Sequence, residues 1–339
     1  MLTLGIETSC DETSCAVLKD GGQLLSNVVS SSLAKHKPFG GVVPEIASRH
    51  CLEQIDLVFQ EALRRAKVSK KDLDLIAVTY GPGLVGSILV GLSFAKALAY
   101  ELKIPFVGVN HLEGHLSANF IEDSPPKGPY IGLIVSGGHT ELTYHKGKSV
   151  KLLGSTIDDA VGEAYDKTAK LLGLGYPGGP IIDRMAQEGD PKAFRFSKPK
   201  QEGRFDFSFS GIKTAVMQLV NNGHSSLRAP EGRSNDRADL CASFQESVAR
   251  WLVEKTISAC RHKKVKEVVV GGGVSANSRL RSLLTQEAEP YRIRVRFPSL
   301  PLTQDNAGMI ARRGWEIYGQ GKRSNWTLSA KPNLKIGES

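Results

Sequence analysis

Two stretches of similar pattern decide the fold: Leu2-Thr-Leu-Gly-Ile-Glu-Thr-Ser-Cys-Asp-Glu-Thr-Ser-Cys-Ala-Val-Leu18 and Tyr130-Ile-Gly-Leu-Ile-Val-Ser-Gly-Gly-His-Thr-Glu-Leu-Thr-Tyr-His145. In each stretch an apolar run leads through a short polar turn into a second run of strand-forming residues. This pattern predicts a β-hairpin. The first hairpin is expected from strands at 2–6 and 13–18, and the second from strands at 130–135 and 140–145.

Similar elements follow both hairpins. A third strand and a helix are expected at 23–29 and 44–66 in the first half, and at 150–153 and 158–172 in the second. Later apolar runs predict buried strands at 75–79, 106–109 and 268–270, with a further helix ending near Tyr100. Because the order strand, hairpin, strand, helix occurs twice, the sequence predicts two related α/β lobes with a ligand cleft between them.

The chain is too long for one hydrophobic core to be the better expectation. We expect an N-terminal lobe over 1–125, joined by part of 305–339, and a C-terminal lobe over 126–304. The stretch 192–209 is polar and basic, and it is predicted to be an insertion or surface loop. Its basic and aromatic residues favour either nucleic-acid contact or a loop held to the body by its rings. These residues are Phe194, Arg195, Phe196, Lys198, Lys200, Arg204, Phe205 and Phe207.

Composition and charge limit the classes of protein. The chain is 40% hydrophobic and 23% charged, it contains no apolar run judged long enough to span a bilayer, and it begins with a strand-like segment instead of a basic leader. We therefore expect a cytoplasmic location and no membrane partner. Five cysteines without a CxxC pair argue against a disulfide framework and a thiolate zinc site. Basic clusters at 250–266 and 312–335 indicate either a phosphate-backbone partner or solvated helix faces.

The segment His111-Leu-Glu-Gly-His115 places two imidazoles on one helical face and so predicts a divalent metal site. A zinc metalloprotease helix carries its general base directly after the first histidine. Here that position is Leu112, and Glu113 is expected to point away from the metal as a residue of the helix surface or of the ligands' surroundings. A protease function is therefore disfavoured.

Three polar or glycine-rich turns predict a nucleotide site. Ser136-Gly-Gly-His-Thr140 and Asp11-Glu-Thr13 occupy equivalent hairpin turns, where backbone N–H groups can approach phosphate. Gly271-Gly-Gly-Val-Ser-Ala-Asn277 ends a strand and opens a helix. Any one of these turns also fits an ordinary tight turn, but their corresponding positions in a duplicated pattern favour a ligand.

Several longer motifs carry a resemblance to a known family. They are Gly5-Ile-Glu-Thr-Ser-Cys-Asp-Glu-Thr13, Val109-Asn-His-Leu-Glu-Gly-His115, Val135-Ser-Gly-Gly-His-Thr140, Asp158-Asp-Ala-Val-Gly-Glu-Ala-Tyr-Asp-Lys167, Tyr176-Pro-Gly-Gly-Pro180 and Gly271-Gly-Gly-Val-Ser-Ala-Asn277. Together they resemble the tRNA threonylcarbamoyladenosine transferase (TsaD) family, earlier labelled O-sialoglycoprotein endopeptidases. The resemblance implies an actin-like (ribonuclease H-like) fold of the actin, hexokinase and sugar-kinase superfamily.

The resemblance also implies site residues. One divalent metal ion per subunit, Fe²⁺ or alternatively Zn²⁺, would be bound by His111, His115 and Asp305. From the sequence alone, the N-cap of a following helix is the favoured interpretation of Asp305. The nucleotide would be held by Ile134, Val135, Ser136, Gly137, Gly138, Asp166, Gly179, Asp183 and Asn277. Glu12 and His139 lie in turns expected to face the metal and phosphate, and either could act as a base or only position ligand.

The implied reaction transfers threonylcarbamoyl from threonylcarbamoyl-adenylate to N6 of adenosine 37 in tRNAs that read codons starting with A. The implied partners are tRNA, a TsaB-like inactive paralogue and a TsaE-like ATPase. Gln304 and the pair Arg312-Arg313 depart from the family pattern, which leaves the surroundings of Asp305 and the tRNA contacts open. Competing hypotheses are a kinase or ATPase of the same superfold, a metalloprotease and a non-catalytic scaffold.

Overall fold

The computed structural model describes residues 1–198, 203–221 and 234–338. Lys200, named above as a candidate nucleic-acid contact, lies outside these residues. The chain divides into two compact units, one formed by Met1–Pro125 with Pro298–Ser339 and the other by Pro126–Phe297. Residues 298–304, which the sequence predicts in the second lobe, thus belong to the first unit.

The first unit contains a five-stranded sheet in the order β3-β2-β1-β4-β5. Its strands are β1 (Leu2–Glu7), β2 (Glu12–Lys19), β3 (Gln23–Ser31), β4 (Leu75–Gly81) and β5 (Phe106–Asn110). The first three strands form an antiparallel meander, and β4 and β5 run parallel to β1. The carboxyl ends of β1, β4 and β5 therefore reach the same edge of the sheet.

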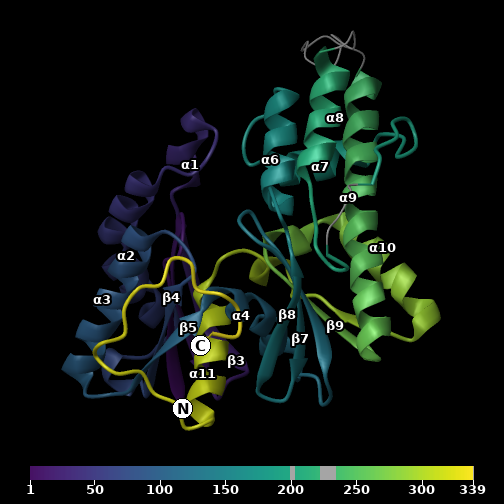
Figure 1. The fold of residues 1–339 in the computed structure, drawn as a ribbon. Helices are drawn as coiled ribbons and strands as arrows, with labels where there is room; N and C mark the ends of the chain where they lie inside the picture. Colours follow the sequence, from purple (N-terminus) through teal and green to yellow (C-terminus); the bar gives the residue numbers. More distant parts are fainter. Residues whose placement is uncertain (199–202, 222–233, 339) are drawn as a thin grey trace. The chain divides into compact units, whose positions relative to one another are not determined.

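Helices bury both faces of this sheet. α2 (Pro44–Ala66) and α3 (Val85–Leu102) cover one face, and α11 (Ala307–Gly319) packs on the other (Figure 1). The strands alternate accordingly, because Ile76 and Val78 belong to the α2–α3 core whereas Leu75 and Ala77 belong to the α11 core. Short helices complete the unit: α1 (Leu33–His36), α4 (His111–Ser117) and α5 (Asn119–Glu122).

One expectation about apolar segments was wrong. The helix Val85–Leu102 has the length and mean hydropathy that a membrane span requires, although the sequence predicts no such run. In the structure this helix packs against α2 and β4, and Ile88, Leu92 and Ala95 are buried there. These contacts are those of a core helix covering a sheet.

The second unit repeats the same sheet. β6 (Tyr130–Val135), β7 (Thr140–Lys146), β8 (Ser149–Ser155), β9 (Glu267–Gly271) and β10 (Arg294–Arg296) pair in the order β10-β9-β6-β7-β8. β6, β7 and β8 form an antiparallel meander, and β9 and β10 run parallel to β6. The predicted duplication of an α/β lobe is confirmed. The helices are α6 (Val161–Leu171), α7 (Gly178–Ala186), α8 (Ser210–Asn221), α9 (Ser234–Lys263) and α10 (Ser278–Ala288).

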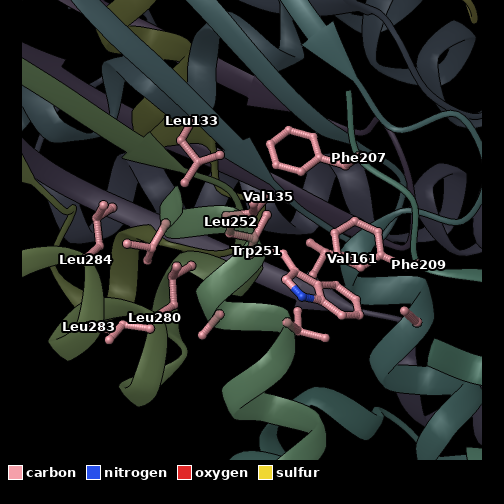
Figure 2. Packing of buried hydrophobic residues seen from close by; sticks show 14 of the residues in the cluster. Leu133, Val135, Val161, Phe207, Phe209, Trp251, Leu252, Leu280, Leu283 and Leu284 are labelled. Atoms are coloured by element: carbon pink, nitrogen blue, oxygen red, sulfur yellow. The ribbon is translucent and has the colours of Figure 1, made fainter. Parts of the chain in front are cut away.

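The stretch 192–209 corrects a second expectation. Phe205, Phe207 and Phe209 are at most 6% exposed and belong to the main core of the second unit, where Phe209 lies beside Trp251 (Figure 2). The backbone of Phe207 also pairs with Ser155 and Ile157 at the end of β8. These rings bury enough apolar surface to make the end of this stretch part of the core and not only a surface loop. Of the two alternatives weighed for it, the contacts favour a segment held to the body by its aromatics.

Gly5 in β1 offers a test of how closely α11 must approach the first sheet. A Cβ on Gly5 would lie 2.1 Å from the carbonyl oxygen of Ala307 and 2.8 Å from the nitrogen of Ala311. We expect Gly5→Val to lower the free energy of unfolding by about 1–3 kcal/mol, because backbone atoms must move. The thermal midpoint should fall, whereas Gly22→Ala, whose Cβ meets open space, should leave it nearly unchanged. Equal midpoints for the two variants would contradict close packing of α11 on β1.

Candidate metal centre and nucleotide-binding residues

Two histidines lie about one helical turn apart in α4: His111 is its first residue and His115 its fifth. The buried strand β5 ends at Asn110, whose side-chain oxygen accepts hydrogen bonds from the N–H groups of Leu112 (3.0 Å) and Glu113 (3.5 Å). This cap starts the helix at His111. His111 and His115 then lie on one face, with ring centroids 4.5 Å apart and exposures of only 7% and 1%. The predicted helical spacing of the two imidazoles is confirmed.

Asp305 joins the two histidines from a distant part of the chain. Its Oδ1 lies 3.5 Å from His111 Nε2 and 3.1 Å from His115 Nε2, and the three ligand atoms all lie within 4.8 Å of one another. Ligands bound at about 2.1 Å from one ion at tetrahedral or octahedral angles are separated by about 3–3.5 Å. The group could therefore hold a divalent cation.

Helix capping does not explain Asp305. The N-cap of α11 is Asn306, whose side-chain oxygen accepts a hydrogen bond from Met309 N at 3.1 Å. Asn306 also donates to the carbonyls of Leu302 and Gln304. Because the neighbouring residue caps the helix, the approach of the Asp305 carboxylate to the histidines does not serve helix capping.

His115 supplies an independent test of whether a cation fits. Among the described residues, neither of its ring nitrogens has a hydrogen-bond partner, although Nε2 lies 3.1 Å from Asp305 Oδ1. A buried imidazole without hydrogen bonds carries an uncompensated desolvation cost. A metal ion between His115, His111 and Asp305 would satisfy this nitrogen, and two imidazoles with one carboxylate form a usual donor set for iron or zinc.

Glu7 is a buried partner of His111 that the sequence did not reveal. Its Oε2 lies 3.0 Å from His111 Nδ1, and the side chain is fully buried. Burial acts to raise the pKa of Glu7, but the charge of His111 outweighs it and holds that pKa below its usual value. Burial acts to lower the pKa of His111, but Glu7 and then Asp305 raise it to about 9. The only hint in the sequence was an acidic residue at the carboxyl end of a buried parallel strand.

Glu12, predicted as a candidate base, begins β2 in the same unit. Burial, followed by the charges of Asp305 and Asp11, raises the pKa of Glu12 well above its usual value. Ser31 Oγ donates a hydrogen bond to its carboxyl oxygen at 3.3 Å. The effect of Asp305 on this pKa places the Glu12 carboxyl in the electrostatic environment of the candidate metal ligands.

Glu113 is not on the helix surface, one of the two positions expected for it. It is 4% exposed, and its Oε2 accepts hydrogen bonds from Arg313 at 2.7 and 2.9 Å. Its other oxygen accepts from the N–H of Gly337 at 3.2 Å. This ion pair joins α4 to α11, so Glu113 connects the two segments that carry the metal-ligand candidates.

The second unit contains the predicted nucleotide residues. The turn between β6 and β7 is closed by a hydrogen bond from Ser136 N to the His139 carbonyl and by one from His139 N to Ser136 Oγ. Gly137 and Gly138 are exposed, and a Cβ on either would meet nothing within 4 Å. The turn thus presents backbone to an open space, as phosphate binding requires. Ile134 and Val135 are fully buried in β6, so they support the turn from within the sheet.

Asp183 and Asn277 lie together beside the start of α10. Asn277 Oδ1 caps this helix by accepting from Leu280 N at 2.9 Å, and Asn277 Nδ2 is 3.4 Å from Asp183 Oδ1. Asp183 also accepts from Ser278 Oγ at 2.7 Å. A buried residue absent from the sequence prediction, Gln245, accepts from Asn277 Nδ2 at 2.7 Å. These side chains are held in place by hydrogen bonds within the protein.

Asp166 and Gly179 lie at another junction of the second unit. Asp166 Oδ1 accepts a hydrogen bond from Gly178 N at 2.7 Å, at the first residue of α7. Gly179 follows directly, and a Cβ there would meet nothing within 4 Å. This hydrogen bond fixes the Asp166 carboxylate beside the start of α7.

The fold defines the class of protein. The chain superimposes on the Acidaminococcus fermentans (R)-2-hydroxyglutaryl-CoA dehydratase component A with a TM-score of 0.57 and 16% identity, covering 94% of this chain and 98% of that one. It superimposes on full-length HypF with a TM-score of 0.60 and 13% identity, covering 96% and 47%. The predicted two-lobed, actin-like α/β fold is confirmed.

The sequence comparisons define the family. A family model described as tRNA N6-adenosine threonylcarbamoyltransferase matches residues 23–312. Proteins of that name are 49% identical in Clostridium botulinum strain 657 (99% of this chain, 98% of the relative) and 50% identical in Clostridioides difficile strain 630 (100% and 99%). Another from Thermosipho africanus is 49% identical over 99% of this chain and all of the relative. The chain belongs to the tRNA N6-adenosine threonylcarbamoyltransferase family.

Adjacent residues at the start of α11 separate metal binding from helix capping. We expect Asp305→Asn to lose most of the bound divalent metal while leaving the thermal midpoint close to that of the wild type. Asn306→Ala should instead lower stability by about 0.5–2 kcal/mol, because α11 loses its cap, while retaining metal. Metal content by elemental analysis and thermal unfolding would be measured on the same preparations. Full metal content in Asp305→Asn would exclude Asp305 as a ligand.

Proposed function

We propose that this protein, a transferase of the family just named, transfers threonylcarbamoyl from threonylcarbamoyl-adenylate to N6 of adenosine 37 in tRNAs that read codons starting with A. The N6 amine attacks the carbamate carbonyl, a C–N bond forms, and the C–O bond to the adenylate phosphate breaks. The amine loses a proton, and the products are the modified tRNA and AMP. The observation that carries the proposal is near 50% identity over essentially the full length of relatives bearing this name.

We assign one divalent metal ion, Fe²⁺ or alternatively Zn²⁺, to His111, His115 and Asp305. When bound, such an ion supplies a Lewis acid that stabilises negative charge developing on carbonyl or phosphate oxygens. Two observations support this assignment: among the described residues the ring nitrogens of His115 have no hydrogen-bond partner, and Asp305 Oδ1 lies 3.1 Å from His115 Nε2 and 3.5 Å from His111 Nε2.

We assign binding of the adenylate to the second unit. The Ser136-Gly137-Gly138 turn, in which the two glycines are exposed, would bind phosphate through backbone N–H groups. The carboxylates of Asp166 and Asp183 suit the ribose hydroxyls, and the Asn277 segment at the start of α10 would border the nucleoside. Adenylate is a good leaving group, so breaking the bond to it needs little assistance. Holding the N6 amine next to the carbamate carbonyl therefore supplies much of the rate.

Two residues are candidates for handling the proton lost by N6, Glu12 and His139. The raised pKa of Glu12 makes its ionised form a stronger base than an ordinary carboxylate. His139 closes the glycine turn through its backbone, and a neutral imidazole can accept a proton. Either residue would accept the proton directly or hold the amine for attack.

Part of the basic charge suits a tRNA partner. Arg261 and Lys264 are exposed near the end of α9, where Arg261 also stacks over Tyr291. In the other basic cluster, Arg312 and Arg313 pair with Glu316 and Glu113 and are largely internal, so they do not suit RNA. We further propose a cytoplasmic location and cooperation with a TsaB-like paralogue, a TsaE-like ATPase and a separate adenylate-forming enzyme.

The alternatives receive less support. The position of a metalloprotease base is occupied by Leu112, and the nearby Glu113 is paired with Arg313. A kinase or ATPase of the same superfold would not need a buried pair of histidines facing an aspartate.

A reconstituted reaction tests the proposed function. The protein would be mixed with its partners, the adenylate-forming enzyme, unmodified tRNA, ATP, threonine and bicarbonate, and tRNA nucleosides would be analysed by mass spectrometry. We expect the wild type to form threonylcarbamoyladenosine. The rate should fall by a factor on the order of 100 or more in His111→Ala and in His115→Ala. The exposed residue Gln320 gives a control variant, Gln320→Ala, which should retain activity. No product from intact wild-type protein would refute the function, and full activity of both histidine variants would refute the metal's role.

A further inference from the structure

Glu7 is fully buried and lies beside Nδ1 of the His111 ring, whereas Asp305 lies beside Nε2 of the same ring. We propose that Glu7 is a positioning residue that fixes the ring orientation and tautomer of His111 for metal binding. This inference rests on the metal site assigned under the proposed function. It concerns a residue that would not touch the metal or the substrates.

The contacts distinguish the two nitrogens of the His111 ring. Nδ1 lies 3.0 Å from Glu7 Oε2 and 3.1 Å from Ser9 Oγ, whereas Nε2 lies 3.5 Å from Asp305 Oδ1. A carboxylate accepts hydrogen bonds and cannot donate them, so the proton of a neutral His111 belongs on Nδ1. The lone pair of Nε2 is then directed to the side where Asp305 and His115 lie.

Glu7 is itself held rigidly. Its Oε2 accepts a hydrogen bond from Thr79 Oγ1 at 2.5 Å, and its Oε1 accepts one from Ser9 N at 2.5 Å. Both Glu7 and Thr79 are fully buried. A carboxylate with several fixed donors cannot turn away from His111 without leaving those donors unsatisfied.

The sheet explains why these groups meet. Glu7 ends β1, Thr79 lies near the end of β4, and His111 directly follows β5. These strands are parallel neighbours, with Ile6 opposite Val78 and Thr79 opposite Val109. The ends of three strands therefore meet at the Glu7 carboxylate and the His111 imidazole. Side chains held by strands are positioned more precisely than side chains held by loops.

This arrangement has a chemical consequence for the metal. An imidazole that donates its other N–H to a carboxylate is a more basic ligand and enters the site already oriented. Glu7 would thus raise metal affinity in two ways. It would polarise the His111 ring, and it would restrict rotation of that ring before the metal binds. The Nε2 of His115 also faces Asp305, but its Nδ1 has no hydrogen-bond partner among the described residues, so His111 is the ligand that this device serves.

Binding of Co²⁺ to metal-free protein tests this role without reference to activity. Glu7→Gln keeps the size and an accepting oxygen but removes the charge. We expect its dissociation constant for Co²⁺, followed by visible absorption, to rise about 10- to 100-fold. Glu246→Gln in the second unit removes another buried, ion-paired carboxylate and should leave Co²⁺ affinity within about twofold of wild type. The ¹⁵N shifts of His111 would be recorded above its pKa of about 9, where the ring is neutral, and should report an Nδ1–H tautomer in metal-free wild type and a mixture in Glu7→Gln.

The outcomes separate this inference from the metal assignment. Wild-type affinity and an unchanged tautomer in Glu7→Gln would overturn the role of Glu7 alone. Failure of the wild type to bind Co²⁺ would instead refute the metal site. If Glu7→Gln does not fold, Thr79→Val keeps the carboxylate but removes one of its donors and should weaken Co²⁺ binding severalfold; unchanged affinity in that variant would also overturn the inference.

Discussion

The candidate metal centre depends on the packing of α11 against β1, because that contact brings Asp305 back to the sheet on which the chain began. The backbones approach closely at Gly5, where a side chain would collide with Ala307 and Ala311. The ion pair between Glu113 and Arg313 joins the same helix to α4. Two histidines fixed after β5 and one aspartate fixed before α11 thereby meet, although almost two hundred residues separate them in the sequence.

The duplicated sheet supplies two different chemistries from one architecture. In the first unit, the edge where β1, β4 and β5 end carries Glu7 and the buried histidines. In the second unit, the turn between β6 and β7 carries two exposed glycines, Gly137 and Gly138, whose backbone is open to solvent. Carboxylates and imidazoles suit a cation, whereas free backbone N–H groups suit phosphate. The repeat thus fits a protein that handles both a metal and an adenylate.

Much of this could be predicted from local pattern, and the rest could not. Strand periodicity located both hairpins, and the spacing of His111 and His115 located α4. Asp305 and Asn306 are indistinguishable as caps in sequence, and only the bond from Met309 N assigns that role to Asn306. The burial of Phe205 and Phe207 depends on pairing with the distant β8, and the contact between Glu7 and His111 depends on strand order. Family resemblance supplied Asp305, but no local signal pointed to Glu7.

X-ray absorption spectroscopy of protein loaded with one equivalent of Fe²⁺ or Zn²⁺ tests the central claim, a site of two imidazoles and one carboxylate, most directly. The account predicts scattering from two imidazole rings and nearby oxygen atoms, with no sulfur. Cys10 is the nearby alternative, but burial and then the charges of Asp11 and Asp305 raise the pKa of its thiol and disfavour the thiolate that a metal needs. A sulfur ligand, or fewer than two imidazoles, would contradict the account.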